Sequence, residues 1–148
     1  MSYHRKTRNY EWVIHLIIRL SIGIFFFVTG FNKLTVDANH KSMLETLTGT
    51  GMPFPVVASY LLSGIEMIAG TFLFLGLFKR LSSVVLIVVM IAAILTVNLH
   101  SIPSGLPLHT WLSYFFYLPE FLLILLLAYL AASPVRDLEL QSLFSRKR

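Results

Sequence analysis

Three ionisable side chains of this 148-residue chain lie where charge is costly. Arg19, Glu66 and Glu120 each occupy an apolar run long enough to cross a bilayer. An ionisable group near the membrane centre costs about 2.5–3.5 kcal/mol even on lenient insertion scales. Such residues are expected to satisfy one another or to serve a function, so they mark a candidate site inside the membrane.

The number of charges suggests what that site could do. One guanidinium cannot fully compensate two buried carboxylates, so we expect Glu66 to pair with Arg19, while Glu120 is protonated or shares a proton with Glu66. Such a group could handle protons, or it could hydrogen-bond a polar head group such as that of a quinone. The alternative is a structural ion pair, with Glu120 reaching the outer interface.

Polar and small residues form one stripe on each of the first two apolar runs, at 100° per residue. The stripes include Arg19, Gly23, Gly30 and Lys33 on the first run, and Ser63, Glu66 and Gly70 on the second. Small residues let helix backbones approach and polar ones hydrogen-bond across the gap, so the two faces are expected to meet. Helix packing alone explains the glycines and serines well, but it explains the charges less well.

The elements that position these residues are apolar segments of about 20 residues, the length of a membrane span. There are four of them, at about 13–31, 56–78, 81–99 and 112–132. Basic residues precede the first span, separate the second from the third, and follow the fourth, which places both termini in the cytoplasm. The predicted fold is an all-α membrane protein, a four-transmembrane-helix bundle forming a single domain over residues 1–148.

Two shorter helices and one kink complete the predicted architecture. An interfacial helix is expected at about 37–47 and a cytoplasmic amphipathic tail at 134–148. Pro119 is expected to kink the fourth span beside Glu120. A helical rise of about 1.5 Å per residue puts Glu66 and Glu120 roughly 18 Å above the inner ends of their spans, and Arg19 roughly 9 Å above its own.

Composition supports lipid as the solvent and excludes several functions. The chain is 56% apolar and 13% charged, against about 45–50% and about 25% for soluble domains. The excess of 12 Lys+Arg over 7 Asp+Glu lies at span ends, so it requires no nucleic-acid partner. The absence of cysteine excludes disulfide exchange, thiolate catalysis and iron–sulfur ligation by this chain.

The histidines do not form a recognisable metal or haem site. His15 is expected near the inner surface and His100 near the outer one, so they cannot hold one haem between them. Asn98 and His100 form a polar outer cluster with His109, but two imidazoles are a weak metal signal. We expect no metal, no intrinsic cofactor and no autonomous enzymatic activity, although a part in an oxidoreductase complex stays open.

Several short motifs, taken in order, resemble the DoxX family. They are Arg19-Leu20-Ser21-Ile22-Gly23, Gly30-Phe31-Asn32-Lys33-Leu34, Gly51-Met52-Pro53, Glu66 with Gly70, Leu75-Gly76, Lys79-Arg80 and Asn98-Leu99-His100. The family pattern has an arginine and a lysine in the first span and a glutamate in the second, which correspond to Arg19, Lys33 and Glu66. It often has paired glycines after the glutamate, where this chain has Ala69-Gly70, and Pro119-Glu120 matches no family motif.

The resemblance implies a small four-helix bacterial inner-membrane protein, some of whose relatives are subunits of quinone-linked redox complexes. We therefore expect an accessory membrane subunit with a buried Arg/Glu site, with the bilayer, a quinone and protein subunits as candidate partners. Two alternatives are a structural or assembly bundle without a ligand, and a small proton-coupled carrier. The carrier ranks last because four spans leave little room for alternating access.

Overall fold

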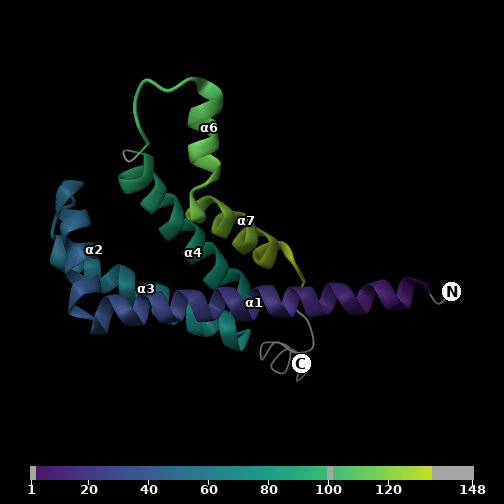
Figure 1. Cartoon of the computed structure of the whole chain (residues 1–148). Coiled ribbons are helices and arrows are strands. Elements are labelled where there is room, and N and C mark those ends of the chain that lie inside the picture. Colours follow the sequence, from purple (N-terminus) through teal and green to yellow (C-terminus); the bar gives the residue numbers. More distant parts are fainter. Residues whose placement is uncertain (1–2, 100–101, 135–148) are drawn as a thin grey trace.

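The computed structural model describes residues 3–99 and 102–134, and these residues are helical apart from short connections. The helices are α1 (Tyr3–Thr35), α2 (Asp37–Gly49), α3 (Pro55–Leu75), α4 (Lys79–Ala93), the π-helical turn η1 (Ile94–Asn98), α6 (Leu108–Phe116) and α7 (Pro119–Ala132) (Figure 1). The predicted tail at 134–148 lies outside the described residues apart from Pro134, and His100 lies outside them too.

Local sequence explains where several helices begin and end. Pro55 and Pro119 each occupy the first position of a helix, where the missing N–H is not needed. Gly76 ends α3 in the left-handed conformation, with φ of 70°, and glycine adopts this conformation without a side-chain clash. The connection from α3 to α4 is therefore short, and α4 starts at Lys79.

The helices associate as two pairs that share one apolar core. α1 lies along α3, and α7 lies along α4, while α3 joins the pairs by packing on α4 (Figure 1). The core residues are Ile22, Phe26, Ala69, Leu73, Leu86, Met90, Leu127 and Leu130. They come from all four helices of the two pairs, so the core holds the pairs together.

Glycines bring the backbones of α1 and α3 close together. A Cβ atom on Gly30 would lie 2.6 Å from the backbone nitrogen of Met67, and one on Gly70 would lie 2.5 Å from that of Phe27. One on Gly23 would lie 2.6 Å from the backbone nitrogen of Phe74. These contacts define an antiparallel register, and α1 and α3 meet along the predicted small-residue stripe.

Among the described residues, three helical segments are long and apolar enough to cross a membrane, namely Tyr10–Thr35, Pro55–Leu75 and Lys79–Asn98. A fourth span is formed only if α6 and α7 are taken together, and these two helices are bent by 60°. The kink expected at Pro119 is therefore a break in the helix. Leu118 adopts an extended conformation, with ψ of 123°, as expected for a residue that precedes proline.

The expected short helix after the first span is present as α2. It extends to Gly49, and Leu47 is its buried residue. At one end of the long α1–α3 pair, α2 turns away from the axis of α1 (Figure 1). This places α2 over the end of α1 and beside the beginning of α3, where it packs on both.

Candidate functional site

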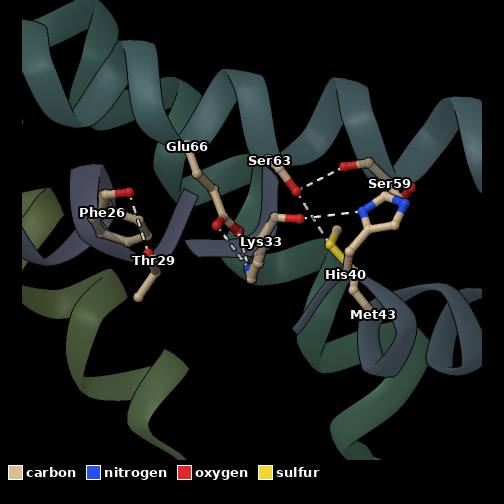
Figure 2. Close-up of polar contacts among 8 residues, drawn as sticks. All are labelled: Phe26, Thr29, Lys33, His40, Met43, Ser59, Ser63 and Glu66. Carbon is tan, nitrogen blue, oxygen red and sulfur yellow. Dashed lines mark hydrogen bonds and ion pairs between the residues drawn. The ribbon is translucent and has the colours of Figure 1, made fainter. Parts of the chain in front are cut away.

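The principal polar contact between α1 and α3 is an ion pair between Lys33 and Glu66. The Lys33 Nζ atom donates to both carboxylate oxygens of Glu66, at 2.9 Å to Oε1 and 2.7 Å to Oε2 (Figure 2). The Glu66 side chain is only 5% exposed, whereas that of Lys33 is 31% exposed. The pair therefore neutralises a carboxylate buried against the α1–α3 interface, and its lysine side chain stays partly exposed.

The predicted pairing of Glu66 with Arg19 is wrong, because the register of the two helices puts these residues at different levels. Gly30 of α1 contacts α3 at Ser63 and Met67, so Glu66 is level with the last turns of α1. Arg19 precedes Lys33 by 14 residues, about 21 Å along a helix. Arg19 is buried, 3% exposed, but it lies near the opposite end of α3.

The beginning of α2 is held over the ion pair by contacts with α1 and α3. The imidazole Nδ1 of His40 lies 3.1 Å from the Lys33 carbonyl oxygen, so this nitrogen carries the proton and donates. The His40 ring also packs on Tyr60, with 4.6 Å between centroids. The Ser63 hydroxyl lies 3.3 Å from the Met43 sulfur and 2.7 Å from the Ser59 carbonyl (Figure 2).

A cavity of about 510 Å³ lies against this ion pair. Its walls come from the end of α1, the inner side of α2, the middle of α3, and α4 with η1. The lining residues are Thr29, Asn32, Lys33, Asn39, Ser42, Met43, Thr46, Leu47, Met52, Leu62, Glu66, Val89, Ala92, Ala93, Thr96 and Val97. The volume is within the range of about 300–1,000 Å³ that is usual for small-molecule sites.

The sequence did not predict that α2 and η1 would line a cavity. The backbone of η1 is π-helical, and π-helical turns are frequent at functional sites. The sequence gives little sign of this turn, because Ile94–Asn98 continues an apolar run without glycine or proline. Asn98, part of the predicted outer cluster, ends η1 and does not line the cavity.

A second buried polar cluster lies at the other end of the bundle. Lys79, which is fully buried, donates to the carbonyl oxygens of Ser133 and Pro134, at 3.1 and 2.9 Å, and lies 3.2 Å from the Ser133 hydroxyl. His15 Nε2 lies 2.9 Å from the same hydroxyl oxygen. This cluster, which we term the basal clasp (His15, Lys79 and Ser133), ties α1 and the start of α4 to the end of α7.

Glu120 is separate from the ion pair. It lies in the first turn of α7, is half-buried, and its Oε2 atom is buried with no hydrogen-bond partner among the described residues. Among the described residues, no hydrogen bond joins Glu120 to Glu66. Both carboxylate oxygens of Glu66 accept from Lys33 instead. The expected sharing of a proton between the two acids is therefore not what the structure shows.

Comparisons with known proteins agree with the predicted resemblance. The DoxX family model matches residues 14–99, which contain α2, α3, α4, η1 and most of α1. A protein of Bacillus subtilis (strain 168), named "Putative oxidoreductase CatD", is 34% identical over 85 residues. That match covers 57% of this chain and 59% of the relative's length.

The matched region contains all the residues that build the cavity, including Lys33 and Glu66, whereas α6 and α7 with Glu120 lie outside it. No solved structure matches the chain. The family match covers more than half of the chain, and its helices are long and apolar enough to span a membrane. The chain therefore belongs to the DoxX family of membrane proteins.

Proposed function

We propose that this DoxX-family membrane protein is an accessory subunit of a quinone-linked redox complex, and that it binds the quinone head group beside Lys33 and Glu66. The observation that carries the proposal is a cavity of about 510 Å³ with a neutralised ion pair on its wall. Ligand sites combine a mostly apolar lining with a few convergent polar groups, and this cavity has both. The oxidoreductase name of the Bacillus subtilis relative agrees with a redox role.

In this proposal the protein lies in the inner membrane with four spans, the fourth made by α6 and α7 together. The distribution of basic residues supports cytoplasmic termini, because Lys79 and Arg80 lie at the same end of the bundle as Ser133. Lys33 lies at the opposite end of α1 from the N-terminus, so the cavity then lies in the outer half of the membrane. The partner subunits would carry the redox centre itself.

A structural or assembly role is the second candidate, and the packing of α1 on α3 favours it. The glycine contacts and the Lys33–Glu66 pair fix the register of these two helices without any ligand. Buried polar pairs can specify one helix register over others. In that case the cavity would be a consequence of helix packing.

Copurification with quinone distinguishes the two candidates. The full-length protein is purified from native membranes, and its lipid extract is analysed for quinone by mass spectrometry. We expect stoichiometric quinone with the wild-type protein and its loss with Glu66→Gln, because the amide no longer fixes the position of the Lys33 ammonium group. The matched control is Glu45→Gln, an exposed carboxylate of α2 that does not line the cavity.

The melting temperature of each variant is measured on the same samples. Loss of quinone at an unchanged melting temperature supports the ligand site. If wild-type protein carries no quinone and Glu66→Gln only lowers the melting temperature, the structural role is correct and the redox role is rejected.

A further inference from the structure

The chemistry of the cavity lining indicates the kind of molecule that it accepts. Among its lining residues, Lys33 and Glu66 are the charged ones, and they neutralise each other. An anionic or cationic head group would therefore enter without a compensating charge, and burying an unpaired charge is costly. The lining favours a head group without net charge.

The hydrogen-bond donors of the same lining differ in what they can offer a ligand. Besides Lys33, the amides of Asn32 and Asn39 and the hydroxyl of Ser42 can donate. The hydroxyl groups of Thr29, Thr46 and Thr96 each donate to a backbone carbonyl of their own helix, so they offer only acceptor capacity to a ligand. Lys33 has three N–H donors, and the contacts with the two oxygens of Glu66 use two of them. The third N–H suits a carbonyl oxygen, and Lys33 is exposed enough for a ligand to reach it.

The two ends of the cavity differ in polarity. Asn39, Ser42 and Thr46 of α2 are exposed polar residues at one end. The opposite wall is an apolar strip of α4 and η1, which consists of Val89, Ala92, Ala93 and Val97. A molecule that fits both ends has a polar head under α2 and an apolar part along this strip.

The apolar strip also gives access from the side. α4 packs closely on α7 and α3, and not on α1 or α2 to a comparable extent within the described residues. The strip therefore lies across the cavity from the wall that α1 and α2 form, and the two walls are not packed on each other. Ala92 is exposed and Ala93 half-buried, so this wall reaches the protein surface on a helix that is long and apolar enough to span a membrane.

We propose that the cavity binds a neutral, carbonyl-bearing amphiphile with one hydrocarbon tail, which enters sideways from the bilayer. Its carbonyl oxygen accepts from Lys33, and its tail lies along the strip of α4 and η1. This inference rests on the proposed function in placing the ligand in the same cavity, and it adds the ligand class, the route of entry and the residues that limit the tail. Prenylquinones and monoacylglycerols share this chemistry.

The test uses the full-length protein in detergent micelles, titrated with decylubiquinone and followed by native mass spectrometry. Ala93→Phe fills the strip, and we expect the apparent Kd to rise by about tenfold, because the phenyl ring occupies the space that the tail would take. Val88→Phe is the matched control, because Val88 is 60% exposed on the same helix and does not line the cavity. It should leave Kd within about twofold.

Ala93→Leu adds less volume than Ala93→Phe and should give an intermediate Kd. This second variant tests the strip even if Ala93→Phe fails to fold. Equal binding of decylubiquinone by Ala93→Phe and wild type would overturn the tail strip while leaving the quinone-linked function intact. Lysophosphatidylglycerol has one acyl tail and an anionic head group. If it binds as tightly as decylubiquinone, the inference that the site selects a neutral head group is overturned.

A monoacylglycerol separates the two sources of the ligand. If both decylubiquinone and the monoacylglycerol bind tightly, and Ala93→Phe weakens the binding of each, the inference is supported for both classes of ligand. Binding of the monoacylglycerol without decylubiquinone supports the inference and rejects the quinone-linked function. If neither binds the wild-type protein, the inference is overturned.

Discussion

The two helix pairs of this protein each contain a lysine at a buried polar contact, but the two lysines have different partners. In the α1–α3 pair, Lys33 is partly exposed and pairs with a carboxylate beside a cavity. In the α4–α7 pair, Lys79 is fully buried and donates to backbone carbonyls at the end of α7. Lys33 is therefore accessible beside a cavity, whereas Lys79 caps the C-terminal end of a helix.

The two helix pairs also differ in how their helices pack. α1 and α3 approach through glycines, so their backbones nearly touch. The α4–α7 pair uses large side chains, with Leu86, Leu127 and Leu130 fully buried. The first pair is therefore held by close backbone contact at fixed points, and the second by apolar volume and the basal clasp.

The largest effect is expected at the basal clasp. Lys79→Met should destabilise the protein by about 3 kcal/mol, because the carbonyl oxygens of Ser133 and Pro134 and the buried Ser133 hydroxyl lose a charged donor. Thermal unfolding in micelles measures this loss. Arg80→Met is the control, because the adjacent Arg80 is exposed. Equal stability of the two variants would show that the clasp does not hold the α4–α7 pair.

A somewhat smaller effect is expected at the glycine contacts. Gly70→Ala would place a methyl group 2.5 Å from the backbone of Phe27, and we expect a loss of about 2 kcal/mol from overpacking.

Gly64 provides the control on the same helix, because a Cβ there meets nothing within 4 Å. Gly64→Ala should stabilise α3 by about 0.5–1 kcal/mol, since alanine loses less conformational entropy than glycine in a helix. If both alanines have the same effect on unfolding, the α1–α3 pair is not held by close backbone contact.

The smallest effect on stability is expected at the ion pair, where variants also test whether Lys33 contacts the ligand. Lys33→Met should cost about 1 kcal/mol, because the Lys33 side chain is partly exposed and its charge is screened by solvent. The double variant Lys33→Met/Glu66→Met should recover this stability, since apolar groups can replace a buried pair.

Both variants should lose decylubiquinone in the native mass-spectrometry titration, because the carbonyl donor is gone. Recovery of stability together with retained binding would mean that Lys33 does not contact the ligand, and the two lysines would then differ in exposure and partner but not in availability to a ligand.

Periodicity was sufficient to predict the helices and the shared polar stripe of α1 and α3. Apolar length predicted three of the spanning segments, whereas the predicted fourth span is a bent pair of helices, and Gly23, Gly30 and Gly70 marked the close interface. These features depend on local sequence, in which each position on a helix is fixed by its neighbours. The presence of Lys33 on the stripe was also predicted, although its partner was not.

The partner of Glu66 depends on how far one helix extends past the other. The sequence estimate assumed that spans end at common membrane levels. In the structure, α3 begins well beyond the end of α1, and α2 packs on this overhang through Tyr60. This offset brings Glu66 level with Lys33. Neither the offset nor the cavity it leaves under α2 follows from helical periodicity.

Because Lys33 and Glu66 lie 2.7 Å apart at their closest atoms, they act on their surroundings as a dipole without net charge. A membrane potential does work of about 2.3 kcal/mol per elementary charge per 100 mV on charge that crosses it. When a neutral molecule enters or leaves beside this pair, no such charge is displaced. If the cavity binds the neutral ligand that we propose, its loading is expected to be insensitive to membrane voltage and equal in energised and de-energised cells.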